Sequence, residues 1–223
     1  TWLKEQGYLT LKEGHATSDD WFDAVDWDRT QAFSLGLTGI FINRVGRERS
    51  GIVEEGAPYQ ALVQRLKTEL EQLKDPKSNA SCIRRVRIAP HFFDGPYRFD
   101  APDLLVGYEG GYRNSWECAV GAVTSEVFSD NTRSWSGDHC VDPEVVPGVF
   151  FCNHGIGTET PKLIDIPPTV LQQFGITPPR YMKGAQLFTS KDIKGLPNPN
   201  ALEQSGRPRL ARAHPVETEV RDV

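Results

Sequence analysis

Residues 58–73 read PYQALVQRLKTELEQL, and this stretch indicates the fold class more clearly than any other. Its apolar residues recur every three or four positions, with Gln, Lys, Glu and Arg between them, which is typical of one face of a helix. These apolar residues are Tyr59, Leu62, Val63, Leu66, Leu70 and Leu73. Pro76 disfavours helical geometry at Asp75, so the helix ends near that point. The pattern predicts an amphipathic helix that packs on another layer of structure.

Short apolar runs on both sides of this helix predict that other layer. GIFI at residues 39–42, LLVGY at 104–108 and the run 146–151 around Gly148 read as buried strands. Residues 84–87, RRVR, alternate as the charged edge of a sheet would. A second helix is expected from Asp165 to Gly175. Helices that alternate with buried strands indicate an α/β fold.

The two ends of the chain suggest where its domains lie. TWLKEQGYL at residues 1–9 predicts a short helix that ends at Gly7 and leads into a strand, as though the chain were entered midway through a fold. We therefore expect a missing upstream segment. From residue 189 onward, Pro, Gly, Asn and Arg accumulate without apolar period. The predicted division is a domain at residues 1–188 and a loosely packed extension at 189–223.

Composition excludes some classes of protein. The formal net charge is -5, and no long basic run exists that would neutralise a nucleic-acid backbone, so duplex nucleic acid is not an expected partner. No run of about eighteen apolar residues is present, so we expect a soluble protein without a membrane span. The four cysteines show no CxxC spacing and leave the compartment open.

The long segment between residues 109 and 147 is rich in Gly, Ser, Asn, Asp and Trp, and long loops of this kind often carry function. Within it, DNTRSWSGDHC at residues 130–140 gathers an imidazole, two carboxylates, a guanidinium and a thiol. Imidazole and carboxylate suit zinc, and a guanidinium suits phosphate. The residue types alone favour a structural interpretation, with turn residues, a cap, a buried cysteine and a hydrogen-bonded histidine, because one histidine is not a ligand set.

Longer stretches of the sequence help to choose between a metal loop and a structural loop. They are DWDRTQAFSLGLTGIFINRVGRERSGIV (26–53), APDLLVGYEGGYRNSWE (101–117), DNTRSWSGDHC (130–140), VPGVFFCN (146–153) and DIPPTVLQQFGITPPRYMKGAQL (165–187). Together they resemble the C-terminal half of bacterial type I phosphodiesterase/nucleotide pyrophosphatase-like proteins of the alkaline-phosphatase superfamily. The resemblance extends from Thr1 to about Leu187, in the order of that family.

This resemblance implies a fold and a metal site. The fold would be part of an alkaline-phosphatase-like sandwich, with a central, mostly parallel sheet flanked by helices. The site would hold two divalent metal ions, commonly zinc, which stabilise the attacking and leaving oxygens of an in-line displacement. His139 in SGDHC matches the family's late metal ligand. Arg133, Asn131, Asp138 and Trp135 are second-choice residues that would contact substrate or orient the imidazole.

The resemblance also implies what these 223 residues lack. No Thr or Ser here matches the family's nucleophile, and the other metal ligands are expected upstream of Thr1, so the isolated chain is expected to be inactive. The substrate would be a small phosphodiester or a nucleotide-like molecule, and the missing half would be linked covalently or present as a separate chain. Tyr112, Arg113 and Trp27 are weaker candidates for residues that line the substrate pocket. The alternative is that they pack beneath the long loop.

Two other functions stay open. Another reaction of the same superfamily, carried out by a phosphatase, a sulfatase or a phosphomutase, differs chiefly in residues outside this chain. A non-catalytic binding or scaffolding relative would keep the fold without the chemistry, although a purely structural surface has no need of so polar a loop. Fold resemblance alone does not establish the reaction.

Overall fold

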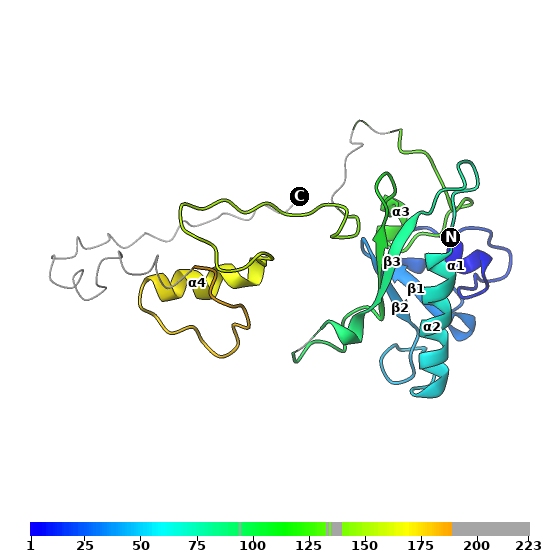
Figure 1. The fold of residues 1–223 in the computed structure, drawn as a ribbon. Coiled ribbons are helices and arrows are strands. Elements are labelled where there is room, and N and C mark those ends of the chain that lie inside the picture. The colour runs from blue at the N-terminus through cyan, green and yellow to red at the C-terminus, as the bar shows by residue number, and fades with distance from the viewer. Residues whose placement is uncertain (94, 133, 135–139, 189–223) are drawn as a thin grey trace, which may run out of the picture. The chain divides into compact units, whose positions relative to one another are not determined.

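The structure is a computed structural model that describes residues 1–93, 95–132, 134 and 140–188. The chain divides into two compact units, residues 1–147 and residues 148–223. The first unit holds a four-stranded sheet and the long helix α2, and the second holds the short helix α4 (Figure 1). The predicted boundary between residues 188 and 189 falls where the described residues end, so it stays a prediction.

The sheet is built from β1 (Ala32–Leu35), β2 (Gly39–Ile42), β3 (Ile83–Ile88) and β4 (Leu104–Tyr108). Its strand order is β1-β2-β4-β3, and every pairing between these strands is antiparallel. β1 and β2 form a hairpin, in which Gly36 adopts a φ of 75°, a conformation that suits glycine. The fold is therefore mixed α/β, but the mostly parallel sheet that the family resemblance implied is not found among the described residues.

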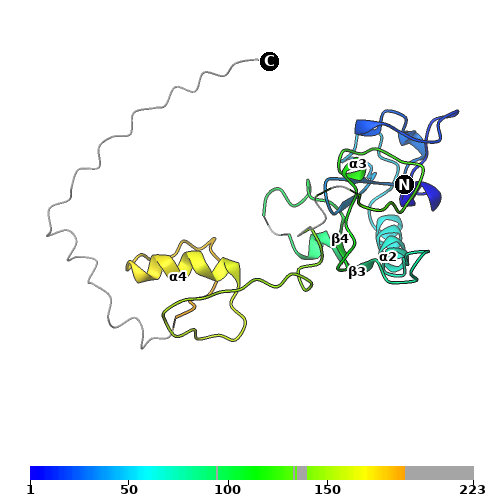
Figure 2. The same ribbon diagram turned by 90° about the horizontal axis from the view of Figure 1, so that it is seen from above.

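Helix α2 (Ala57–Glu71) covers one face of this sheet and packs on β3 (Figure 2). Its buried residues are Leu62, Val63, Leu66 and Leu70, which the spacing in the sequence had selected. From the sheet, residues such as Ile40, Val86 and Leu104 join the same core. The predicted helix is thus confirmed, and its last residue lies four positions before Asp75.

Aromatic side chains pack on the other face of the hairpin. Phe33 and Phe41 pair across β1 and β2, and side chains alternate along a strand, so they lie opposite Ile40 and Ile42. Their rings stack with centroids 5.3 Å apart. Trp27 meets the Phe33 ring edge-on at 5.1 Å, and this cluster anchors the chain that leads into β1.

Several shorter segments complete the first unit. They are α1 (Trp2–Glu5), η1 (Asp20–Phe22), η2 (Trp27–Arg29), η3 (Ala89–His91) and α3 (Trp116–Ala119). The predicted opening helix is confirmed, and Gly7 follows it with a φ of 76°. The strand expected after it is reduced to a single bridge between Leu11 and Val25.

The prediction of a buried strand at residues 146–151 is wrong. This run is irregular, and Val149 and Phe151 are 83% and 89% exposed. Pro147 has no backbone N–H to donate to a neighbouring strand, and Gly148 has no side chain that could pack. The apolar run was therefore not enough to form a strand here.

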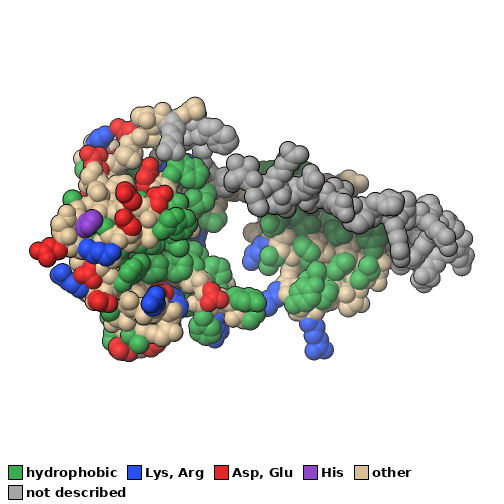
Figure 3. Space-filling view, turned by 180° about the vertical axis from the view of Figure 1, so that it is seen from behind, with side chains coloured by type: hydrophobic (Ala, Val, Ile, Leu, Met, Phe, Trp, Pro, Cys, Tyr) green, Lys and Arg blue, Asp and Glu red, His purple; other side chains and the backbone are tan. Residues whose placement is uncertain are grey.

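The second unit is described from residue 148 to residue 188. Its helical part is η4 (Leu163–Asp165) followed by α4 (Ile166–Gln173); the sequence predicted α4 but not η4. The buried Asp165 carboxylate accepts hydrogen bonds from the backbone N–H groups of Lys162 and Ala185, at 2.9 Å and 2.8 Å. Many apolar side chains of this unit remain exposed, and green side chains occupy much of its visible surface in Figure 3.

Among the described residues, no helix is both long enough and apolar enough to cross a membrane. The longest, α2, has 15 residues and carries charged side chains on its outer face. A bilayer core needs roughly twenty consecutive apolar residues in a helix.

Candidate functional site

The predicted metal loop is described only at its two ends. Residues 133 and 135–139 lie outside the described residues, so the predictions for Arg133, Trp135, Asp138 and His139 remain predictions. Asn131, the fifth candidate, is described and is exposed. What the structure defines is how the chain enters this segment at Asp130 and leaves it after Cys140.

The start of the loop is fixed only weakly by contacts with the rest of the first unit. Lys77 Nζ donates to Asp130 Oδ2 at 3.0 Å, but the two side chains are 75% and 80% exposed. Water and salt screen such a pair, and the long Lys77 side chain loses conformational freedom on forming it. This contact raises the pKa of Lys77 above its ordinary value, yet it does little to fix the backbone at residue 130.

The exit from the loop is anchored firmly at Asp142, whose side chain is fully buried. Arg87 on β3 donates to the carboxylate from Nη1 and, at 3.3 Å, from Nη2. The backbone N–H of Glu144 donates to it at 3.0 Å, and the N–H of Asp142 donates to the carbonyl of Tyr108 at 2.9 Å. Asp142 is therefore bound to both strands β3 and β4.

The local sequence and the electrostatics both favour this anchor. Gly107 lies directly under the carboxylate, because a β-carbon at that position would come within 3.0 Å of Asp142 Cβ and would collide with the carboxylate oxygen. Burial opposes ionisation of Asp142, but the hydrogen bonds from Arg87 and from the N–H of Glu144 outweigh it and lower the pKa of the carboxyl. Asp142 is thus held as a carboxylate next to a guanidinium.

The described residues do not make a metal site by themselves. No group of three or more His, Cys, Asp and Glu side chains among them is arranged to hold a metal ion. Zinc in proteins takes three or four such ligands, and the one predicted ligand, His139, is outside the described residues. A zinc site that includes His139 would need further ligands beyond those that the described residues bring together.

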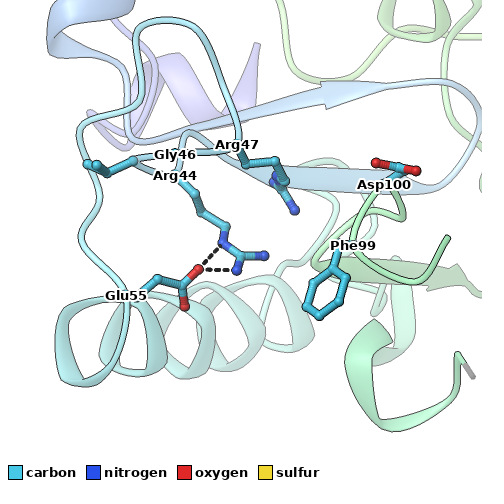
Figure 4. Close-up of a pocket in the computed structure, with 7 residues that line it drawn as sticks. Arg44, Gly46, Arg47, Glu55, Phe99 and Asp100 are labelled. Atoms are coloured by element: carbon cyan, nitrogen blue, oxygen red, sulfur yellow. Dashed lines mark hydrogen bonds and ion pairs between the residues drawn. The ribbon is translucent and has the colours of Figure 1, made fainter. Parts of the chain in front are cut away.

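A second feature, at the opposite end of β4, was not predicted from the sequence. Two adjoining cavities of about 460 Å³ and 250 Å³ share Arg44, Arg47 and Phe99 in their walls, and we call them together the arginine pocket. The larger, outer cavity also has Glu55 and Asp100 in its wall. Figure 4 shows the guanidinium groups of this outer cavity, with the Phe99 ring facing the same space.

The smaller, inner cavity is lined by nine residues: Arg44, Arg47, Tyr59, Pro90, Arg98, Phe99, Ala101, Pro102 and Asp103. Asp103 is 1% exposed and lies where β4 begins. Its carboxylate accepts hydrogen bonds from the N–H of Ile42 at 2.6 Å and from Tyr59 Oη at 2.9 Å. Asp103 therefore joins β2, α2 and β4 at one point.

Two arginines balance the buried charge of Asp103. Arg47 donates to it from Nη2 at 2.7 Å and from Nη1 at 3.3 Å, while Arg44 Nη1 lies 3.4 Å away. Burial raises the pKa of Tyr59, and the negative charge of Asp103 raises it further, so the phenol stays protonated as a donor. Burial opposes the charge on Arg47, but Asp103 and Glu48 outweigh it and raise its pKa.

The residues suggested as walls of a substrate pocket make contacts with other side chains of the first unit. Trp27 packs in the aromatic cluster beside β1. Tyr112 Oη donates to Asp75 Oδ2 at 3.0 Å, and the Arg113 guanidinium lies over the Trp116 ring at 4.5 Å. Trp27 and Tyr112 thus have packing or hydrogen-bond partners within the protein, while contact with a substrate stays a prediction.

Comparison with protein-family models, with curated proteins and with solved structures found no match to this chain. The class that the structure itself defines is a mixed α/β unit with a small antiparallel sheet. Its function has to be argued from the anchored loop and from the arginine pocket.

Proposed function

We propose that this chain is part of a metal-dependent hydrolase of phosphodiester or pyrophosphate bonds, and that it supplies a late metal-ligand loop to the active site. The order of the sequence strings that resemble type I phosphodiesterases and nucleotide pyrophosphatases supports this function. The observation that carries it is the Asp142 anchor. A buried ion pair with Arg87 fixes the backbone two residues after the DNTRSWSGDHC segment, and functional loops need such support from rigid strands.

In this proposal, His139 holds one of two divalent metal ions, with zinc as the expected metal. Such ions would supply charge stabilisation to the attacking and leaving oxygens of the phosphoryl group. Arg133 and Asn131 would contact the substrate, and Asp138 and Trp135 would orient the imidazole or line the pocket. The nucleophile and the remaining ligands come from outside these 223 residues, so the chain alone is expected to be inactive.

Two alternatives differ in what they predict. Another reaction of the alkaline-phosphatase superfamily would keep the metal and change the substrate to a monoester, a sulfate ester or a sugar phosphate. A non-catalytic relative would keep the fold and lose tight zinc binding. The absence of a ligand cluster among the described residues is compatible with that relative, because one histidine cannot hold zinc alone.

An assay of ester hydrolysis by the natural protein that contains this chain separates these functions. We expect zinc-dependent hydrolysis of bis(4-nitrophenyl) phosphate that a chelator abolishes and added zinc restores. 4-Nitrophenyl phosphate and 4-nitrophenyl sulfate serve as matched substrates for the phosphatase and sulfatase alternatives. Hydrolysis of only the monoester would identify a phosphatase, and hydrolysis of only the sulfate ester would identify a sulfatase. Hydrolysis that needs no zinc, or no hydrolysis of any of the three substrates, would contradict a metal-dependent hydrolase.

A further inference from the structure

We propose that the arginine pocket is a binding site for a small organic oxyanion, with a phosphate or carboxylate group in the inner cavity. No residue of the predicted metal loop lines either cavity, and the inference does not depend on the proposed hydrolase activity. The inference combines the shape of the two cavities with the charges, hydrogen-bond donors and aromatic ring that line them.

The charges of the inner cavity favour an anion. It is lined by Arg44, Arg47 and Arg98 and by a single carboxylate, that of Asp103. Asp103 is buried and already accepts hydrogen bonds from the backbone, from Tyr59 and from two guanidinium groups. Arg44 and Arg47 therefore already balance Asp103, and Arg98, which pairs with no carboxylate among the described residues, supplies the positive charge that an entering anion meets.

Unused hydrogen-bond donors remain on these arginines. A guanidinium has five N–H donors in a fixed plane, and it binds carboxylate or phosphate best through two parallel hydrogen bonds. Arg44 makes three hydrogen bonds to side chains of the protein, to Glu55 and Asp103. The Arg98 guanidinium makes no hydrogen bond to a described residue and lies 4.8 Å from the centroid of the Phe99 ring.

Two of the three guanidinium groups are already held in place. Arg44 is fixed by Glu55 and lies over the Tyr59 ring at 4.8 Å, and its side chain is only 14% exposed. Arg47 is fixed by Glu48 and Asp103 and is 18% exposed. Binding of an anion to preorganised groups costs less conformational entropy, because only the Arg98 side chain has to be ordered when the anion binds.

The outer cavity indicates what the rest of the ligand looks like. Glu55 and Asp100 line it and balance Arg44 and Arg47 there, so a second anionic group is unfavourable at this position. The Phe99 ring is 59% exposed and forms an apolar wall to both cavities. The best ligand therefore has one anionic end and an uncharged, flat or apolar body that contacts Phe99.

Titration of the protein with inorganic phosphate, acetate and phenyl phosphate tests this site, with the arginine Nε–H signals in NMR spectra as the readout. We expect saturable shifts of the Arg98 and Arg47 signals, and about threefold tighter binding of phenyl phosphate than of inorganic phosphate, because its ring stacks on Phe99. Saturation by phosphate alone, by acetate alone or by both identifies the anionic group and supports the site in each case. No saturable shift with any of the three overturns it.

Three variants locate the binding energy. Arg98→Ala should weaken binding about tenfold or more, and Arg98→Lys, which keeps the charge but not the planar fork, should weaken it less. Arg49→Ala is the matched control, because Arg49 is exposed and does not line either cavity. Equal losses in Arg98→Ala and Arg49→Ala would show a general charge effect and would refute a built site.

Discussion

Replacement of Asp142 by Asn tests the anchor on which the proposed function rests. The two side chains have nearly the same size, so the change removes the charge without creating a cavity. It leaves the Arg87 guanidinium without its carboxylate beside a buried amide. The hydrogen bonds from Arg87 Nη2 and from the N–H of Glu144, at 3.3 Å and 3.0 Å, lose their charged acceptor.

The expected cost is about 3 kcal/mol in the free energy of unfolding. A hydrogen bond to a charged group contributes roughly 1.5–3 kcal/mol, and removal of one partner of a buried ion pair costs about 3–5 kcal/mol. We take the lower part of that range because the Arg87 side chain is 18% exposed and can still reach water. The Asn amide oxygen also keeps part of the hydrogen bonding.

Urea unfolding followed by tryptophan fluorescence measures this cost, with Lys77→Ala as the control at the other end of the same loop. The Lys77–Asp130 pair is exposed, so its loss should leave the unfolding midpoint unchanged within error. Hydrogen exchange should also become faster at residues 140–146 of Asp142→Asn, while α2 keeps its protection. A loss below about 0.5 kcal/mol, or equal effects of the two variants, would refute the anchor.

Three further results are expected from the same geometry. Gly107→Ala should destabilise the protein by about 1–3 kcal/mol in urea unfolding, because its methyl group collides with the Asp142 carboxylate; a neutral effect would contradict the close approach. The stability difference between wild type and Asp142→Asn should be full at pH 6 and shrink as the pH falls below about 4. The folded-state pKa of Asp142 lies below its ordinary value of 3.8, so the carboxylate stabilises the folded state fully above pH 3.8 and loses this effect as it is protonated. A stability difference independent of pH would argue against an ionised Asp142. Leu66→Ala should lower the free energy of unfolding by about 2–5 kcal/mol in thermal or urea unfolding, because Leu66 is 0% exposed. Gln64→Ala, on the outer face of α2, should leave it almost unchanged. Similar effects of the two variants would mean that α2 is packed differently.

The sequence predicted those elements whose signal is local. The spacing of Leu62, Leu66 and Leu70 specifies the buried face of α2, and the apolar runs at 39–42 and 104–108 are strands as expected. β1 was missed because its sequence, AFSL at Ala32–Leu35, contains a serine and an alanine and so does not stand out as an apolar run. The run at 146–151 was overpredicted because hydrophobicity alone does not provide a partner strand.

The two sites that the structure adds depend on contacts between residues far apart in the sequence. Asp103 meets Arg47 across 56 positions, and Asp142 meets Arg87 across 55. No periodicity or spacing rule identifies such pairs, since each residue by itself looks like an ordinary surface charge. The only local signals were a single Asp placed directly before a buried strand and a Gly inside that strand. The antiparallel order of the sheet is likewise set by long-range pairing.

The proposed function requires that His139 holds a catalytic metal in the complete active site. Elemental analysis of the purified natural protein, with and without His139→Ala, tests this proposal, and Leu66→Ala, which lowers stability through a change in α2, checks that a folding defect is not the cause. We expect up to two bound zinc ions in the wild type, a clear loss of bound zinc in His139→Ala, and an unchanged circular dichroism spectrum. Equal zinc content in the wild type and in His139→Ala, or no bound zinc in either, would contradict it.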